Sequence, residues 1–83
     1  GVETHVKEEM KRFLLDRPEI SQIYNFLTLQ LGPDAMVAVK AGMHKTGSET
    51  ELLNAINRVE REFREAFPMT AWLFFEPDNS DEE

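Results

Sequence analysis

The chain has 83 residues, no cysteine, and only nine basic residues against sixteen acidic ones. Without cysteine it can form neither a disulfide framework nor a thiolate metal site, which suits a reducing compartment. The net charge of −7 is the wrong sign for binding nucleic acid or an anionic membrane surface, so we expect no nucleic-acid partner. No stretch approaches the ~18–20 apolar residues of a membrane span, and no signal peptide is recognisable. With 41% hydrophobic and 30% charged residues, the composition is typical of one small globular domain.

Sequence signatures of catalysis are also lacking. There is no glycine-rich phosphate loop, no HExxH zinc motif, no cysteine nucleophile, and no Ser–His pair with a plausible third member. Carboxylates are plentiful, but they lie on predicted helix faces and in the C-terminal segment. A catalytic carboxylate pair needs a pocket that separates two pKa values, and a domain of this size offers little room for one. We therefore expect no enzymatic activity.

Two segments have the apolar spacing of amphipathic helices. The first runs from Val2 to Leu15, and Pro18 ends it because the residue before a proline is pushed out of the helical conformation. The second begins at Ser48, which forms a predicted capping box with Glu51, and continues to Pro68. Its charged side predicts pairs four residues apart on a solvated face. These pairs are Arg58/Glu62, Glu60/Arg64 and Arg61/Glu65.

The remaining segments alternate between two faces, as β-strands do. The stretch from Ile23 to Met43 predicts two strands folded back on each other around Gly32-Pro33-Asp34, and 69–76 predicts a third. Odd-numbered apolar residues form the face that we expect to be covered. They are Ile23, Leu27, Leu29, Leu31, Val37, Val39, Ala41, Met43, Met69, Ala71, Leu73 and Phe75.

The predicted element order is α-β-β-α-β. The helix between the second and third strands is a crossover, so these two strands should run parallel, with both helices on the odd-numbered face. The expected fold is therefore an α+β, ferredoxin-like open-faced sandwich with a three-stranded mixed sheet and two helices on one face. We expect it to span residues 1–77 and to be followed by an acidic, disordered tail at 78–83.

The even-numbered face is left open by this arrangement. It carries Tyr24, Phe26, Met36, Ala38, Trp72 and Phe74. A contiguous aromatic patch on a monomer usually marks an interaction site. Three explanations stay open: self-association, most commonly as a two-fold dimer, a covering segment outside this chain, or a ligand-binding surface.

Four features together resemble the C-terminal cytoplasmic domain of the cation diffusion facilitator family. They are residues 25–33 (NFLTLQLGP), the V-A-V strand at 37–39, the helix start at 48–51, and the two segments Phe67-Pro68 and Phe75-Glu76-Pro77 near the C-terminus. The likeness extends from about Glu9 to Pro77, and the order and spacing carry it, not any single motif. It implies a homodimeric cytoplasmic domain of a divalent metal cation efflux transporter (zinc, iron, cadmium class). The domain, itself soluble, would lie on the cytoplasmic side of the membrane beside its own transmembrane domain, and a chain that opens with Gly1 fits a piece of such a protein.

Many members of that family bind zinc or a related ion at the dimer interface, largely through histidines. The positions that match those ligands here are Tyr24, Lys40, Phe74 and Glu76, and zinc would accept only the carboxylate of Glu76. An ammonium group such as that of Lys40 repels a dication and has no lone pair to offer. We therefore expect the usual interface metal site to be absent and no cofactor to be required. The expected interface residues are Tyr24, Phe26, Lys40, Trp72 and Phe74.

Three residues remain as candidate ligands for weak divalent cation binding, with zinc as the foremost ion: Glu76, His44 and His5. His44 lies on the even-numbered face, and His5 is four residues before Glu9 on the first helix. A plain solvated histidine is the simpler interpretation of each. The alternative function is a free-standing ferredoxin-like module that binds a protein or a small ligand on the open face.

Overall fold

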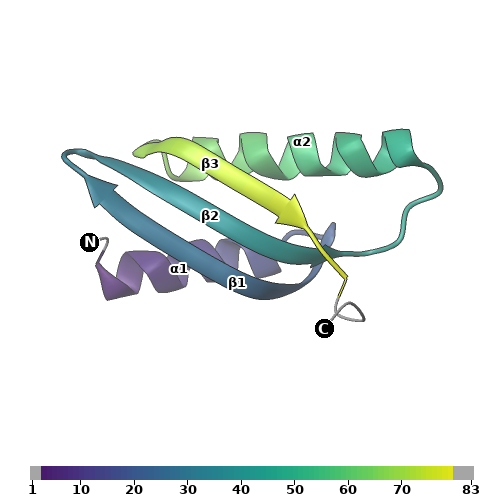
Figure 1. The fold of residues 1–83 in the computed structure, drawn as a ribbon, viewed down its shortest axis with the longest axis horizontal. Coiled ribbons are helices and arrows are strands. Elements are labelled where there is room, and N and C mark those ends of the chain that lie inside the picture. Colours follow the sequence, from purple (N-terminus) through teal and green to yellow (C-terminus); the bar gives the residue numbers. More distant parts are fainter. Residues whose placement is uncertain (1–2, 80–83) are drawn as a thin grey trace.

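The computed structural model describes residues 3–79 and contains the five predicted elements in the predicted order (Figure 1). They are α1 (Thr4–Leu15), β1 (Ile20–Leu31), β2 (Asp34–Met43), α2 (Glu49–Ala66) and β3 (Thr70–Pro77). Strand β2 is central, antiparallel to β1 and parallel to β3, so the mixed sheet and the crossover helix are confirmed. No helix in residues 3–79 is both long and apolar enough to cross a membrane. Val2 of the first predicted helix and residues 80–83 of the predicted tail lie outside the described residues.

Helix α2 begins where the capping box predicts. The Ser48 hydroxyl accepts a hydrogen bond from the Glu51 amide at 3.1 Å. The Glu51 carboxylate reaches back to the Gly47 amide at 2.6 Å, one residue beyond the usual partner in this motif. The cap thus satisfies two backbone donors and fixes the point where the chain turns from the sheet into the helix.

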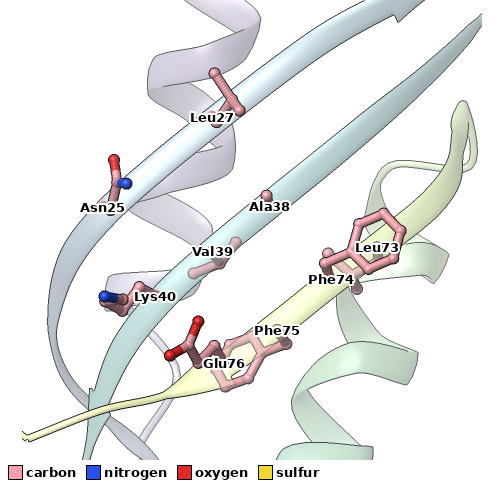
Figure 2. Close-up of a pocket in the computed structure, with 9 residues that line it drawn as sticks. All are labelled: Asn25, Leu27, Ala38, Val39, Lys40, Leu73, Phe74, Phe75 and Glu76. Carbon is pink, nitrogen blue, oxygen red and sulfur yellow. The ribbon is translucent and has the colours of Figure 1, made fainter.

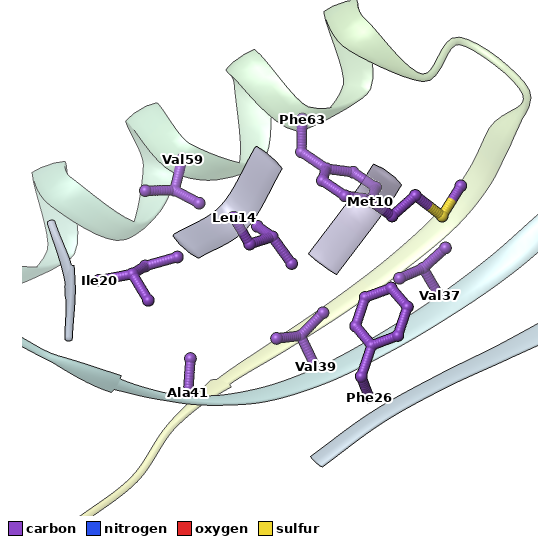
Figure 3. Close-up of a cluster of buried hydrophobic side chains, with 9 residues drawn as sticks. All are labelled: Met10, Leu14, Ile20, Phe26, Val37, Val39, Ala41, Val59 and Phe63. Carbon is purple, nitrogen blue, oxygen red and sulfur yellow. The ribbon is translucent and has the colours of Figure 1, made fainter. Parts of the chain in front are cut away.

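Both helices pack against the same face of the sheet, so the open-faced sandwich is confirmed. Buried side chains from α1, α2, β1 and β2 meet in one cluster (Figure 3). Leu73 and Phe75 of β3 pack against this cluster. The buried members are Met10, Leu14, Ile20, Phe26, Val37, Val39, Ala41, Val59 and Phe63. The ring of Phe63 also contacts the ring of Phe67, with their centroids 5.0 Å apart. This single core leaves the opposite face of the sheet without a covering helix.

Strand β1 departs from strict alternation because its pairing with β2 shifts twice. Ile20 pairs with Met43 and Gln22 with Gly42, so Ser21 is an extra residue on β1. Ile23 pairs with Ala41 and Asn25 with Lys40, so Tyr24 is a second extra residue. Each such bulge reverses the face that the following residues present.

The bulge at Tyr24 moves Phe26 into the core. Ile20, Ile23 and Phe26 face the helices at intervals of three residues, and Phe26 is only 9% exposed. The prediction that Phe26 lies on the open face is therefore wrong. The prediction that Leu27, Leu29 and Leu31 are covered is wrong for the same reason, since they are 54%, 47% and 44% exposed.

Strand β3 has one similar shift, at Ala71. Ala35 pairs with Thr70 but Met36 pairs with Trp72, so Ala71 is the extra residue. Thr70 consequently faces the core, whereas Met69 and Ala71, which the alternation assigns to the covered face, are exposed. From Trp72 onward the predicted alternation holds.

Replacing Thr70 with valine is expected to stabilise the fold by about 1 kcal/mol. Thr70 is 6% exposed, and its hydroxyl has no hydrogen-bond partner among the described residues. An unpartnered buried hydroxyl costs about 1–3 kcal/mol, and valine has the same shape without that group. Urea denaturation of Thr70→Val and of Thr70→Ser, which keeps the hydroxyl and loses the methyl group, measures the effect. A valine variant no more stable than the parent chain would contradict the prediction.

Candidate functional site

The open face is the side of the sheet that faces away from α1 and α2, and the strand register defines its residues. They are Asn25, Leu27, Leu29 and Leu31 of β1, Met36, Ala38 and Lys40 of β2, and Trp72, Phe74 and Glu76 of β3. The register aligns them in rows across the sheet. Leu29–Met36–Trp72 and Leu27–Ala38–Phe74 form an apolar half toward the β1–β2 hairpin, with Leu31 beyond them. Asn25–Lys40–Glu76 form a charged end toward the C-terminal ends of β2 and β3.

The Tyr24 ring lies over Gly42 of β2. A side chain at Gly42 would meet the Tyr24 hydroxyl at 3.1 Å and its ring at 3.3 Å, so glycine at this position leaves room for the ring. The Tyr24 hydroxyl accepts a hydrogen bond from the Gln22 side-chain amide at 2.9 Å. Because Gly42 is two residues after Lys40 on β2, the Tyr24 ring covers the open face as the sequence predicts.

A hollow of about 390 Å³ opens over the middle of the face (Figure 2). Its floor includes Ala38, whose small side chain leaves the space unfilled, and Leu27 and Phe74 lie on either side in the same row. Lys40 and Glu76 line the end of the hollow that lies nearer the C-terminal ends of β2 and β3. The hollow is therefore apolar in the middle and charged at one end, and Phe74, which is 59% exposed, stands beside it.

The charged end contains both signs of charge. Lys40 faces Glu76 in the register, and its ammonium group lies 3.4 Å from the Asp78 carboxylate. The Asn79 amide donates a hydrogen bond to that carboxylate, and this bond, together with Lys40, lowers the pKa of Asp78 despite some desolvation. The Asp78 amide donates to the Ala41 carbonyl at 2.8 Å. Asp78, the first residue of the predicted tail, is thus attached to β2.

The side chains of the open face do not fit the zinc ion that the resemblance implies. Of the four matching positions, only Glu76 offers a ligand that zinc accepts, and its partner in the strand register is the cationic Lys40. Within residues 3–79, no three histidine, aspartate or glutamate side chains gather closely enough to hold a metal ion. The candidates Glu76, His44 and His5 are therefore not brought together. His5 lies near Glu3, the residue that precedes α1, with its Nδ1 3.5 Å from the Glu3 carboxylate. His44 is the residue after the end of β2.

Sequence reasoning missed the three leucines of the apolar half and placed Phe26 there in their stead. One signal was available: Asn25 is the only polar residue in the first odd-numbered set. A polar residue on a covered face is unfavourable unless it is hydrogen-bonded, and a bulge just before Asn25 moves it to the open face.

No family model and no curated protein matches the chain. Solved structures do share its fold. The zinc form of CzrB, described as a candidate zinc transporter, has a TM-score of 0.82 at 18% identity, over 100% of this chain and 94% of that one. A second CzrB structure has a TM-score of 0.77 at 21% identity, over 95% and 100%. A variant of the MamM C-terminal domain has a TM-score of 0.80 at 9% identity, over 92% and 96%. The chain therefore has the ferredoxin-like fold of the cytoplasmic C-terminal domains of cation diffusion facilitator proteins.

Proposed function

We propose that this chain is the cytoplasmic C-terminal domain of a divalent metal cation transporter (zinc, iron, cadmium class) of the cation diffusion facilitator family. The observation that carries the proposal is the fold, which matches the CzrB domain along the whole chain with a TM-score of 0.82. The resemblance of residues 9–77 to the same family is a feature of the sequence and supports the proposal as well. The proposal predicts that the coding sequence before Gly1 encodes membrane-spanning helices. A gene that begins at this domain would favour the free-standing binding module.

The role that we propose for the domain is to hold two protomers together. The open face supports this role because Trp72 and Phe74 are 46% and 59% exposed on a continuous sheet surface. A monomer rarely exposes such a patch, and a two-fold dimer is the commonest way to bury it. In the full-length protein, a change in the separation of the two domains would reach the membrane helices. A ligand can bias that separation only through unequal affinity for the two states.

The dimer that we propose forms without an interface metal ion. Tyr24, Trp72 and Phe74 would supply packing where the family resemblance implies metal ligands, and Lys40 already occupies the charged end with an ammonium group. The transported cation would be a substrate of the membrane domain, so its identity does not depend on this surface. Weak zinc binding at Glu76, His44 or His5 is the competing outcome that the test below can detect.

Sedimentation velocity in chelator, and then in excess zinc, tests the proposal. We expect a dimer with the same sedimentation coefficient in both, and Phe74→Ala should weaken it about 10- to 100-fold, as loss of an interface aromatic does. The matched control is Leu53→Ala, since Leu53 is 54% exposed on α2, away from the open face.

Other outcomes would contradict parts of this proposal. A dimer that compacts in zinc would contradict metal independence and direct mutagenesis to Glu76, His44 and His5. A monomer in both conditions would contradict self-association and favour the binding module.

A further inference from the structure

Strand β1 is an edge strand, because the sheet in residues 3–79 has the order β1–β2–β3 (Figure 1). Proteins usually protect such an edge from further pairing with a charged side chain, a proline or a bulge. Strand β3, at the other edge, has all three, in Glu76, Pro77 and the extra residue Ala71. The half of β1 from residue 25 to 31 has none of them, since both bulges of β1 lie before it.

The strand register shows which backbone groups of this half point away from the sheet. The Ala35 amide donates to the Met69 carbonyl at 2.9 Å, so Ala35 does not bond to its β1 partner, Gln30. Along an antiparallel pair, residues of this kind alternate with residues that bond across the pair. The register is continuous from residue 25 to 31, so the backbone groups of Phe26, Thr28 and Gln30 all point outward.

Two of these outward amides are available to a partner. The Phe26 amide donates to the side-chain oxygen of Asn25 at 2.9 Å, which ends the free part of the edge. The amides of Thr28 and Gln30 have no hydrogen-bond partner within residues 3–79. Their spacing of two residues is the spacing at which one strand bonds to the next. This part of β1 is therefore prepared to pair with an extended backbone.

The side chains on the two sides of this edge differ in character. On the open face Leu27, Leu29 and Leu31 form an apolar row, and each is between 44% and 54% exposed. On the other side α1 runs alongside β1 in the opposite direction (Figure 1). Lys11 of α1 and residues 22–26 of β1 line a hollow of about 510 Å³ that opens at this edge.

The helix side of the edge carries positive charge. Lys7 is one turn before Lys11 on the same side of α1, which places it nearer the outward amide of Thr28. Lys11 lies 3.8 Å from the Glu8 carboxylate, and Lys7 makes no ion pair within residues 3–79. A strand added to β1 would thus have the leucines on one side and ammonium groups on the other.

We infer that residues 26–31 of β1 accept an extended segment of another protein as a fourth strand. The segment that fits has apolar side chains at alternate positions, beside the leucines, and a carboxylate among the intervening side chains, near Lys7 and Lys11. Main-chain hydrogen bonds would supply the affinity, and the alternating side chains would supply the specificity. The inference concerns the edge of the sheet and does not depend on the dimer proposed above.

A second copy of the chain fits this edge less well. Pairing two β1 edges about a two-fold axis leaves all helices on the same side of the joined sheet, so the two α1 helices lie next to each other. Lys7 and Lys11 of one copy would then approach the same lysines of the other, and like charges disfavour such a contact. A segment with a carboxylate at this place replaces the repulsion with attraction.

The heptapeptides VTVEVTV and VTVKVTV, which differ only in the central residue, test the side-chain part of the inference. In fluorescence anisotropy at low salt we expect VTVEVTV to bind about 5-fold more tightly, as one or two exposed ion pairs allow. The net charge of −7 favours the lysine peptide at long range, so this preference must come from local basic groups. Combining Lys7→Gln with Lys11→Gln should remove the preference. Lys45→Gln, in the β2–α2 connection, is the matched control and should keep it.

Thr28→Pro tests the backbone part, because it deletes one outward amide. Proline is tolerated where an edge amide points to solvent, so the far-UV circular dichroism spectrum should match that of the parent chain. Binding of VTVEVTV should weaken at least about 10-fold, since a donor is lost and the ring obstructs the approaching strand. VTVEVTV that is N-methylated at every residue should show a similar loss on the parent chain, whatever the folding of the variant. Hydrogen exchange followed by NMR should show that unmodified VTVEVTV slows the amides of Thr28 and Gln30.

Several results would overturn the inference. They are equal binding of the two peptides, no binding of either up to about 1 mM, and binding that Thr28→Pro and N-methylation leave unchanged. Slow exchange of the Thr28 and Gln30 amides without peptide, at high chain concentration only, would identify a second copy as the occupant and overturn it as well. Sedimentation velocity of Thr28→Pro should match that of the parent chain, so failure of this inference is distinguishable from failure of the proposed dimer.

Discussion

Replacing Phe26 with alanine is expected to lower the free energy of unfolding by about 3–5 kcal/mol, as for other buried phenylalanines. Replacing its neighbour Leu27 is expected to cost about 0.5 kcal/mol or less. The reason is the bulge at Tyr24, which makes Phe26 a core residue at 9% exposure and leaves Leu27 54% exposed on the open face. Strict alternation along β1 would instead predict the larger loss of stability for Leu27→Ala and the smaller one for Phe26→Ala. The pair of variants therefore tests the register of the strand.

The size of the Phe26 effect makes it easy to measure. At ~0.05–0.15 kcal/mol per residue, a domain of this length has a total stability of roughly 4–12 kcal/mol, so Phe26→Ala removes a large part of it. Urea denaturation followed by far-UV circular dichroism gives the free energies. Both variants should be compared with the parent chain at the same low protein concentration, because dimerisation adds to apparent stability. Equal losses, or a larger loss for Leu27→Ala, would contradict the observed register.

The sequence predicts the element order and most helix boundaries because their signals are local. The Ser48 cap and the prolines at 18 and 68 act within one turn of the backbone they delimit, and apolar spacing identifies the covered side of each helix. The parallel arrangement of β2 and β3 follows from the helix between them. None of these inferences depends on the details of strand pairing.

Strand register was less predictable because a bulge inserts a residue without any turn residue to mark it. Ser21, Tyr24 and Ala71 are ordinary strand residues, and only the partner strand reveals that they are extra. Each bulge exchanges the two faces of the strand for the residues that follow it. A missed bulge therefore gives a wrong list of residues for the open face. Strict alternation places Phe26 on the open face and the three leucines in the core, and both placements are wrong. It places Trp72 and Phe74 correctly because no shift follows Ala71.

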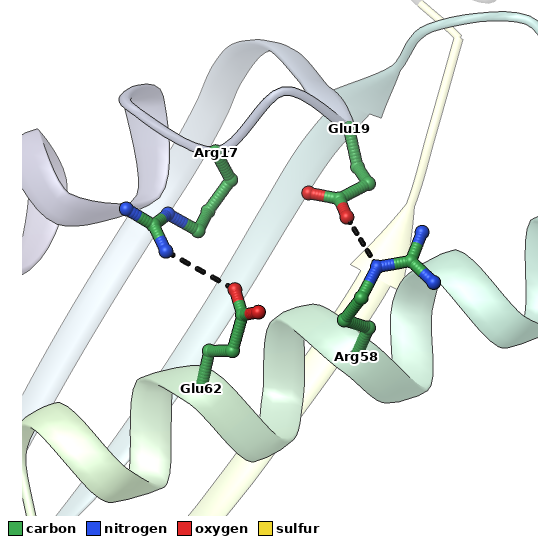
Figure 4. Close-up of polar contacts among 4 residues, drawn as sticks. All are labelled: Arg17, Glu19, Arg58 and Glu62. Carbon is green, nitrogen blue, oxygen red and sulfur yellow. Dashed lines mark hydrogen bonds and ion pairs between the residues drawn. The ribbon is translucent and has the colours of Figure 1, made fainter.

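The contacts between α2 and the segment before β1 were also beyond sequence reasoning. Spacing within α2 predicts that Arg58 pairs with Glu62. In the structure Arg58 donates to the Glu19 carboxylate at 2.6 Å, and Glu62 accepts from Arg17 at 3.1 Å (Figure 4). These partners are 39 and 45 residues distant in the chain, so helical periodicity cannot identify them. The two pairs fasten the α1–β1 connection to α2.

Glu19 is the more deeply placed of these carboxylates, with a side chain that is 12% exposed. Its burial disfavours the charged form and by itself would raise the pKa of Glu19. The hydrogen bond from Arg58 and the positive charges of Arg58 and Arg17 outweigh that effect, so the pKa lies below its usual value of 4.5. A pKa that is lower in the folded chain means that folding favours the ionised carboxylate. This contribution is fully present above pH 4.5 and is lost as the pH falls through the pKa of the folded state.

Glu19→Gln is therefore expected to lower the free energy of unfolding by about 1–2 kcal/mol at pH 7. A fully buried ion pair that loses one partner costs about 3–5 kcal/mol, but Arg58 is 45% exposed and water solvates it when the carboxylate is gone. The matched control is Glu65→Gln, which removes the same charge from the exposed side of α2 and should change stability by less than about 0.5 kcal/mol. Urea denaturation at pH 7 and at pH 3 measures both variants against the parent chain. The deficit of Glu19→Gln should shrink at pH 3, because that pH lies below 4.5 and the stability contributed by the ionised carboxylate diminishes as the pH falls below this value. A deficit of equal size at both values would mean that Glu19 stabilises the fold by packing alone and that the charge on its carboxylate contributes nothing.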